Sequence, residues 1–298
     1  IGYLLINSLE RTIMQRQNIQ WFPGHMAKTR RLIGEKLPLI DLVAEIIDAR
    51  IPYSSRNPEL SEWVKSKPRI ILLNKCDMAD ESITAEWVEK LNDENTTAIP
   101  IDCKTGSGFN KFLPTVKTIL ADRIKKLEEK GMSGKTLKVM IVGIPNVGKS
   151  SFINRIAGTN RAKVENRPGV TRGNQWFMIG KGVEMMDTPG VLWPKFEDNT
   201  VGEHLAFCGS VKDTVLDVEL LAMDLVKELK ALYPEMLKAR YKLDIDLAET
   251  DDYDILCEMG RKRGMKASGG DVDTERMANT FLEEFRNTKI GRMTLERP

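Results

Sequence analysis

The sequence predicts an α/β domain built on a parallel sheet, followed by an all-α domain. Apolar runs of strand length alternate with helical stretches up to about residue 199, and this alternation is typical of parallel sheets covered by helices. One of these runs, residues 137–142, leads directly into a glycine-rich loop that opens a helix. Beyond residue 200 the apolar spacing becomes helical. The clearest apolar faces comprise Val218, Leu221, Leu225 and Leu229, and Met277, Phe281 and Phe285.

This change of pattern divides the chain into three segments. We predict a tail over residues 1–17, an α/β domain over residues 18–199 and a helical domain over residues 200–298. The tail begins with a mildly apolar stretch at residues 1–9. It has no basic flank and no small-residue cleavage site, so we do not interpret it as a signal peptide.

Composition excludes several functional classes. With 45 basic and 43 acidic residues the net charge is +2, so any nucleic-acid surface has to be a local patch. Four cysteines without a C-x-x-C pair and only two histidines argue against a zinc site and indicate reduced, cytosolic thiols. No apolar run approaches the roughly 18 residues of a membrane helix, so we expect no membrane partner.

In chain order, the α/β domain opens with the turn-forming Pro23-Gly24 and a helix over residues 26–36. Short apolar runs next to turn residues predict buried strands; they lie at residues 42–47, 69–73, 97–101 and 137–142. The helical stretches between and after them cover residues 57–65, 82–92, 109–130 and 150–157. A hairpin around Gly180-Lys-Gly182 precedes a last strand that ends at Asp187. Ligands of such a sheet bind at the carboxyl ends of its strands.

The loop after residues 137–142 matches a phosphate-binding motif. Its sequence, Gly143-Ile-Pro-Asn-Val-Gly148-Lys149-Ser150, fits G-x-x-x-x-G-K-[ST]. Backbone N–H groups and a helix N-terminus then converge on anionic oxygens. Lys149 would neutralise the β- and γ-phosphates, and the Ser150 hydroxyl would bind Mg²⁺. The alternative, a plain glycine turn, is disfavoured by the flanking strand and helix. The expected nucleotide contacts are Asn146, Val147, Gly148, Lys149, Ser150 and Ser151.

Asn74-Lys75-Cys76-Asp77 follows a buried strand and matches the Asn-Lys-x-Asp motif with which GTPases read guanine. The Asp77 carboxylate can accept from guanine N1–H and the 2-amino group. Adenine lacks both donors, so a site built around this pair rejects it. Asn74 would brace the loop and the purine, and the stem of Lys75 would cover the ring face. Alone this motif is often a solvated loop, but with the phosphate loop it indicates GTP and GDP as ligands.

Two further loops complete the expected site. Asp102-Cys103-Lys104 lies where GTPases usually carry Ser-Ala-Lys, whose backbone N–H contacts the purine oxygen. The departure is mild, because the backbone makes that contact. In Asp187-Thr-Pro-Gly190, Asp187 would hold Mg²⁺ through water, and the Gly190 N–H would face the γ-phosphate. Thr171 is the candidate switch threonine that binds Mg²⁺ in the triphosphate state; the alternative is a hydroxyl that caps a turn.

The order of these motifs is unusual. The base motif comes first, then the purine loop, the phosphate loop, the switch threonine and Asp-x-x-Gly, whereas ordinary G domains begin with the phosphate loop. Such an order corresponds to a circular permutation, which costs little where chain ends lie close together at the surface. We therefore predict an α/β, circularly permuted P-loop GTPase domain with a C-terminal all-α domain.

This combination resembles the circularly permuted GTPases of the ribosome biogenesis GTPase A (YlqF) family over about residues 18–298. The segments that carry the resemblance are Gln20-Trp-Phe-Pro-Gly-His-Met-Ala-Lys28, Asp48-Ala-Arg-Ile-Pro52, Asn74-Lys-Cys-Asp77, the phosphate loop and Asp187-Thr-Pro-Gly-Val-Leu-Trp-Pro-Lys-Phe-Glu-Asp198. The resemblance implies a cytoplasmic GTPase that binds the large ribosomal subunit, its RNA and its proteins, late in assembly. It also implies hydrolysis stimulated by that subunit and a helical domain that contacts ribosomal RNA.

The residue that positions the attacking water is not the usual one. Many GTPases carry glutamine directly after Asp-x-x-Gly, but here that position is Val191, which has no hydrogen-bonding side chain. The permutation places the helix at residues 26–36 where the helix after Asp-x-x-Gly normally lies. His25 at its start is therefore our candidate, in agreement with what is proposed for the family's N-terminal histidine. The alternative for His25 is a surface or capping role.

Two further sets of contacts are predicted. Asn146 matches the asparagine that binds K⁺ in related potassium-dependent GTPases, and such a K⁺ could replace an arginine finger; alternatively, Asn146 only satisfies the loop backbone. Basic residues are the candidates for RNA contact, although charge runs are usually solvated faces. They are Lys28, Arg30 and Arg31, and Arg261, Lys262 and Arg263.

Three functions remain to be compared. The first is a GTPase that gates a step of large-subunit assembly. The second is a GTP-dependent adaptor for a protein partner with incidental hydrolysis, which Val191 supports. The third, an adenine-nucleotide enzyme, is disfavoured by Asp77.

Overall fold

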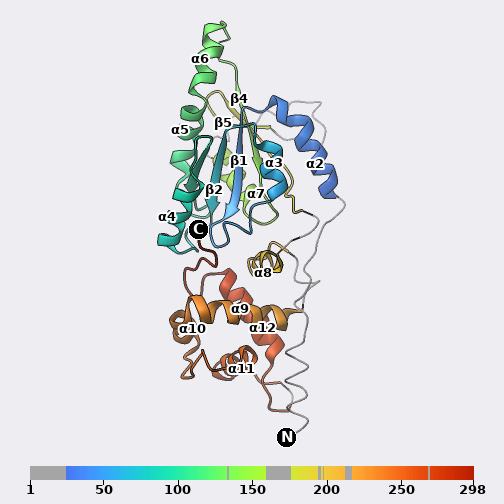
Figure 1. Cartoon of the computed structure of the whole chain (residues 1–298), viewed down its shortest axis with the longest axis vertical. Helices are drawn as coiled ribbons and strands as arrows, with labels where there is room; N and C mark the ends of the chain where they lie inside the picture. The colour runs from blue at the N-terminus through green and yellow to red at the C-terminus, as the bar shows by residue number, and fades with distance from the viewer. Residues whose placement is uncertain are drawn as a thin grey trace.

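The computed structural model describes residues 25–132, 134–158, 176–193, 196, 198–211, 217–267 and 269–298, and of His25 and Met26 it describes the backbone alone. Within these ranges the chain forms a six-stranded sheet of order β3-β2-β1-β4-β6-β5 (Figure 1). The strands are β1 (Leu42–Asp48), β2 (Arg69–Asn74), β3 (Thr96–Pro100), β4 (Leu137–Val142), β5 (Trp176–Gly180) and β6 (Val183–Met186). Neighbouring strands are parallel except in the β5–β6 hairpin. The predicted α/β class is confirmed.

The strand order brings the motif-bearing loops to one edge. β1 is buried along its whole length, as its apolar composition predicts for the centre of a parallel sheet. It pairs with β2 on one side and β4 on the other. The loop after β2 carries the guanine motif, and the loop after β4 carries the phosphate motif. Because parallel strands end at the same edge, both loops emerge there.

Helices cover the sheet, with α4 and α5 on one side of the strands and α2 and α3 on the other in Figure 1. In order these elements are α2 (His25–Lys36), the 3₁₀ turn η1 (Leu37–Leu39), α3 (Pro58–Val64), α4 (Glu81–Leu91), α5 (Phe109–Ile119), α6 (Ala121–Glu129) and α7 (Lys149–Gly158). Side-chain caps begin two of them: Asn57 accepts from the N–H groups of the second and third residues of α3, and Asp80 does the same for α4.

The predicted single helix over residues 109–130 is instead two helices. α5 ends at Ile119, and at Leu120 the backbone leaves helical geometry, with φ −95° and ψ 14°. Leu120 is buried, whereas most of α6 is exposed. The helix is therefore interrupted at Leu120, and α6 extends beyond the sheet (Figure 1).

The region after residue 198 is helical, as expected. It contains α8 (Asn199–Phe207), α9 (Val218–Leu232), α10 (Pro234–Tyr241), α11 (Asp252–Lys262) and α12 (Thr274–Arg286). The predicted apolar faces of α9 and α12 are buried, except that Val218 is only partly so. None of the helices described is long and apolar enough to cross a membrane.

The two regions share one continuous buried cluster, which includes residues of the sheet and of α8, α9 and α12. The chain also returns after α12: residues 287–298, here named the return segment, run back to the lower end of the sheet (Figure 1). There the Leu295 N–H donates to Arg50 O at 2.9 Å. The division at residue 200 remains a prediction, since part of the segment assigned to the helical domain packs on the sheet.

Candidate nucleotide-binding site

The phosphate-loop motif lies where the sequence predicts, between β4 and α7. Gly148 has φ +102°, a left-handed conformation that favours glycine. A Cβ at that position would lie 2.2 Å from Asn74 Nδ2, so a side chain there would displace Asn74. Asn146 also has a positive φ, 61°. The loop therefore depends on both its glycines and its asparagine for its shape.

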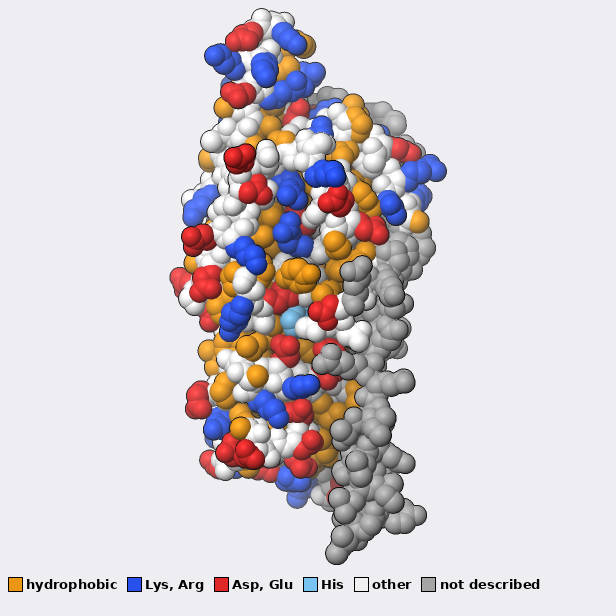
Figure 2. Space-filling view, in the orientation of Figure 1, with side chains coloured by type: hydrophobic (Ala, Val, Ile, Leu, Met, Phe, Trp, Pro, Cys, Tyr) orange, Lys and Arg blue, Asp and Glu red, His pale blue; other side chains and the backbone are white. Residues whose placement is uncertain are grey.

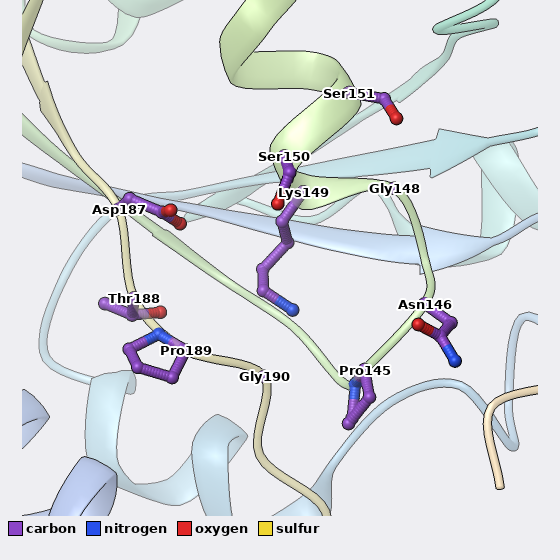
Figure 3. Close-up of a pocket in the computed structure, with 10 residues that line it drawn as sticks. All are labelled: Pro145, Asn146, Gly148, Lys149, Ser150, Ser151, Asp187, Thr188, Pro189 and Gly190. Carbon is purple, nitrogen blue, oxygen red and sulfur yellow. The ribbon is translucent and has the colours of Figure 1, made fainter. Parts of the chain in front are cut away.

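A cavity of about 440 Å³ brings this loop together with the Asp187-Thr-Pro-Gly190 segment (Figure 3). Its lining comprises Pro145, Asn146, Gly148, Lys149, Ser150, Ser151, Asp187, Thr188, Pro189 and Gly190. The two segments are in direct contact, because the Val191 N–H donates to Gly143 O at 3.2 Å. A Cβ on Gly190 would lie 2.7 Å from Pro145 N, so only glycine permits this approach.

Lys149 is the buried cation of the cavity. Its Nζ donates to Gly143 O at 3.0 Å and Ile144 O at 2.7 Å. Burial lowers the pKa of Lys149 to about 8, and the neighbouring Asp187 only partly opposes this. A bound phosphate would favour the charged ammonium. The loop thus holds a buried amine whose charged form would be stabilised by an anionic ligand.

The donor set in this cavity fits Mg²⁺. Ser150 and Asp187 offer a hydroxyl and a carboxylate, and Mg²⁺ in nucleotide sites binds one or two protein oxygens with phosphate oxygens and water. Burial raises the pKa of Asp187, and the charge of Lys149 opposes this only in part. A bound cation would therefore stabilise the ionised carboxylate. Among the residues described, no cluster of three or more His, Cys, Asp or Glu could hold a metal ion by itself.

Asn74 joins the guanine motif to the phosphate loop. Its Nδ2 donates to Val147 O at 2.6 Å, and its Oδ1 accepts from the Cys103 N–H at 3.1 Å. One buried side chain of the guanine motif therefore contacts both the phosphate loop and the Cys103 loop. The two turns lie side by side at the same edge of the sheet.

The Asp102 loop is held by its own side chain and by α7. Asp102 accepts from the N–H groups of Lys104 (2.6 Å) and Thr105 (2.9 Å) and from the Thr105 hydroxyl. Burial raises its pKa, but these hydrogen bonds outweigh that effect and hold the pKa below its ordinary value. Arg155 of α7 donates to Lys104 O at 2.9 Å and to Thr105 O.

Lys75 and Asp77 have different surroundings. The Lys75 ammonium pairs with the wholly buried Asp48 at 2.8 Å, so this end of the side chain is directed at β1. Arg50 also binds Asp48 with two hydrogen bonds, and these cations outweigh burial and hold the pKa of Asp48 well below its usual range. Asp77 is exposed. Partial burial of its carboxyl group, and then the charge of the nearby Asp102, nevertheless raise the pKa of Asp77.

Asn146 links the phosphate loop to the helical region. Its Nδ2 donates to Gly209 O, just after α8, at 2.8 Å. Its Oδ1 faces the cavity (Figure 3). The backbone contact is thus made by the nitrogen, and the oxygen remains on the side where a cation would bind.

Comparisons with known proteins agree with this geometry. A family model described as "50S ribosome-binding GTPase" matches residues 138–250. Ribosome biogenesis GTPase A of Bacillus licheniformis is 44% identical over 94% of this chain and 98% of its own length. The Priestia megaterium protein of the same name is 46% identical over 94% and 97%.

The chain belongs to the ribosome biogenesis GTPase A family.

Solved structures of a family member have the same fold. The GDP-bound structure of YlqF from Thermotoga maritima matches with TM-score 0.65 and 28% identity, over 90% of this chain and 99% of that one. The GNP-bound structure matches with TM-score 0.61 and 27% identity, over 91% and 98%. As a member of this GTPase family, the chain is a P-loop protein that binds and hydrolyses GTP.

Some predicted residues of this GTPase lie outside the described part. Thr171 and the side chain of His25 are among them. The helix that begins at His25 packs near α3, since Arg30 pairs with Glu59 at 3.8 Å and lies 5.0 Å from the Trp63 ring centroid. The cap of α3, Asn57, donates to Val191 O at 3.1 Å. The middle of α2 and the residue after Asp-x-x-Gly are therefore connected through α3.

Most of the basic residues predicted to contact RNA have acidic partners. Arg31 pairs with Glu35, Arg261 with Glu258, and Lys262 with Asp244. Arg263 binds Glu284 and lies over the ring of Tyr241. Lys28 is exposed. RNA contact stays a prediction, and the pairing shows that much of this charge is already used within the fold.

Sequence reasoning missed the residues that brace the base side. Arg50, Arg155 and Arg292 each bind backbone or carboxylate groups of the loops around it. Arg50 had a signal in its sequence, because Asp48-Ala-Arg50 directly follows a buried strand. Arg292 had none, since its partners lie more than 200 positions away in the chain.

Proposed function

We propose that this GTPase acts on the maturing large ribosomal subunit and that its nucleotide state gates binding and release. The observation that carries the nucleotide part is the Asn74 side chain, which contacts both the phosphate loop and the Cys103 loop. Ribosome binding is supported by the description of the matching family model, "50S ribosome-binding GTPase". The motif order along the sheet supports a circularly permuted G domain, and the absence of a membrane-spanning helix among the residues described is consistent with a cytoplasmic protein.

The residues divide the work as follows. Asp77 accepts from guanine N1–H and the 2-amino group, and the backbone at Asp102 and Cys103 faces the purine oxygen. Lys149 and the loop N–H groups bind the β- and γ-phosphates. Ser150, Asp187 and Thr171 would hold Mg²⁺, which when bound neutralises charge on the phosphates. Gly190 N–H faces the γ-phosphate.

Gating has a direct physical route in this chain. The phosphate loop contacts the helical region through Asn146 and Gly209, and the segment after Gly190 leads within a few residues into α8. Ordering of these loops by a γ-phosphate would bias the position of that region. Co-sedimentation with purified large subunits tests this. We expect more protein in the pellet with a GTP analogue than with GDP; equal amounts would contradict gating.

His25 is the proposed water-positioning residue, because the Val191 side chain is apolar and buried. We expect His25→Ala to lower subunit-stimulated turnover by about a hundredfold without changing GTP affinity. The measurement is phosphate release with and without large subunits. Stimulated turnover equal to that of the wild type would remove His25 from the mechanism.

K⁺ is a proposed second cofactor, bound by Asn146 Oδ1 on the cavity side. Its charge would stand in for an arginine finger. Turnover that is the same in Na⁺ and K⁺ would contradict this role.

The second candidate is a GTP-dependent adaptor for a protein partner, with incidental hydrolysis. Val191 favours it, since a glutamine is missing where water is usually oriented. Turnover in the presence of purified large subunits separates the two functions: strong stimulation supports the assembly GTPase, and none supports the adaptor.

A further inference from the structure

The return segment lies against the turn that presents Asp77. Arg292 donates from Nη2 to Cys76 O at 3.1 Å and from Nε to Ala79 O at 2.8 Å. These carbonyls lie on either side of Asp77 in the chain. Because the guanidinium is planar and its donors form a fixed fork, one side chain holds both ends of the turn at a set separation.

Two neighbouring residues strengthen this contact. The Met293 N–H donates to Met78 O at 3.1 Å. The Thr294 hydroxyl accepts from the Asp80 N–H at 3.1 Å and donates to Ala49 O at 3.4 Å. Met293 and Thr294 are almost completely buried. The backbone from Cys76 to Asp80 is therefore held from one side by consecutive residues of the return segment.

The return segment is itself fixed from its other side. The Tyr233 hydroxyl, at the end of α9, accepts from the Thr294 N–H at 3.0 Å and donates to Thr294 O at 2.9 Å. Trp87 of α4 donates to Glu296 O at 3.1 Å. A rigid support thus lies behind Arg292, as precise positioning requires.

We propose that Arg292 is a positioning residue for guanine recognition, setting the turn that aims the Asp77 carboxylate at the base. The inference rests on the proposed guanine-reading role of Asp77. Arg292 also acts on Asp77 through its charge. Burial and Asp102 raise the pKa of this carboxyl, and Lys104 and Arg292 oppose them. Both effects favour an ionised, correctly placed acceptor.

The test compares binding of GDP and IDP by titration calorimetry. IDP lacks the 2-amino group that Asp77 is proposed to bind, so the ratio of the two affinities reports the position of this carboxylate. We expect Arg292→Ala to lower GDP affinity about tenfold and IDP affinity no more than about threefold. Arg292→Lys should retain part of the preference, because an ammonium reaches one carbonyl but not both.

Glu81→Gln is the matched control. It removes the exposed ion pair that Arg292 makes at 3.4 Å and leaves both bonds to carbonyls intact, so the GDP-to-IDP ratio should not change. Should Arg292→Ala fail to fold, Thr294→Val removes the bond from Asp80 N, and we expect it to reduce the ratio about twofold to threefold. A wild-type ratio in the folded Arg292 variant, or in Thr294→Val if it replaces that variant, overturns the inference.

Asp77→Asn distinguishes the two levels of the argument. If it abolishes the preference for GDP over IDP and Arg292→Ala does not reduce it, the role of Arg292 is wrong and that of Asp77 stands. If Asp77→Asn keeps the preference, the guanine-reading role is itself wrong, and the inference fails with it.

Discussion

At the scale of single residues, the site depends on side chains that serve two loops at once. Asn74 bonds to the phosphate loop and to the Cys103 backbone, and Asp48 binds both Arg50 and Lys75. If one of these side chains is removed, the groups that it bonded to stay buried without a partner. That lowers the free energy of unfolding by more than the hydrogen bond itself contributes. Asp77 differs, because it is exposed and open to a ligand.

Asp77→Asn should therefore change nucleotide choice rather than stability. The variant loses the acceptor for N1–H and the 2-amino group, and two charge-assisted bonds correspond to about a hundredfold or more in affinity. An amide can instead donate to the 2-oxygen of xanthine, so we expect a change of preference from GTP to XTP. Competition binding with GTP, XTP and ATP measures it; an unaltered preference for GTP would contradict guanine reading.

At the scale of elements, short loops between buried strands and capped helices fix the site. Asn57 shows how one cap does more than begin a helix: its Oδ1 accepts from the Glu59 and Leu60 N–H groups, while its Nδ2 donates to Val191 O. α3 is thereby tied to the segment after Gly190. The Asn57 Oδ1 therefore stabilises the start of α3, and its Nδ2 fixes the backbone next to the candidate site.

Substitutions at Asn57 should separate these two roles. Asn57→Ala loses both and should lower the free energy of unfolding by about 2 kcal/mol. Asn57→Ser keeps a capping oxygen but cannot reach Val191 O, and should lower it by about 1 kcal/mol. Urea denaturation measures both changes. Equal losses for the two variants would show that the cap contributes nothing.

Elements were predictable where their signal is local. The strands at residues 42–47 and 137–142 and the phosphate loop follow from apolar runs and a glycine pattern within ten or so residues. The break at Leu120 was not predictable, because the apolar spacing of α5 continues into α6. Arg292 was not predictable either, since its partners are backbone carbonyls, which leave no pattern in the sequence.

At the scale of the whole molecule, a buried histidine links the regions. His204 of α8 bonds through Nδ1 to Glu296 at 2.8 Å and through Nε2 to Glu228 at 3.3 Å, and Glu296 also accepts from the Ser54 N–H at 3.0 Å. Burial lowers the pKa of His204, but the hydrogen bonds from its two carboxylate partners and their charges outweigh this and raise it to about 9. A pocket of about 320 Å³ beside it is lined by three acidic residues, Glu203, Asp224 and Glu228, and by the basic Lys227.

This histidine makes stability depend on pH. Its folded-state pKa of about 9 lies above the ordinary 6.5, so its contribution is complete below about pH 6.5 and is lost as the pH rises through 9. The full contribution is on the order of 3 kcal/mol. The lowered pKa of Lys149, about 8, acts in the opposite sense above pH 8, so the clearest window is pH 6.5 to 8.

We expect the free energy of unfolding to fall across that window in the wild type and to change less in His204→Gln. Urea denaturation at several pH values measures both. A variant with the same pH dependence as the wild type would show that His204 is not the titrating group. Glu296→Gln is a second check, since it should reduce the same slope by removing one partner of the imidazolium.

The face of the molecule in Figure 2 carries no single large patch of one charge. Basic and acidic side chains are interspersed over most of the face in Figure 2, and the net charge of the whole chain is only +2. Blue side chains also gather on α6, where it extends beyond the body. A macromolecular partner of this face would meet mixed charge over the sheet rather than a single basic field.

The position of the return segment bears on how the protein is made. Arg292 is translated 213 and 216 positions after the carbonyls it binds, whereas the strands beside the glycine loop are complete much earlier. During synthesis the phosphate loop is therefore complete before Arg292 is added, and the whole helical region is translated between them. We expect a nascent chain stalled before residue 292 to bind nucleotides with a weaker preference for guanine than the finished protein.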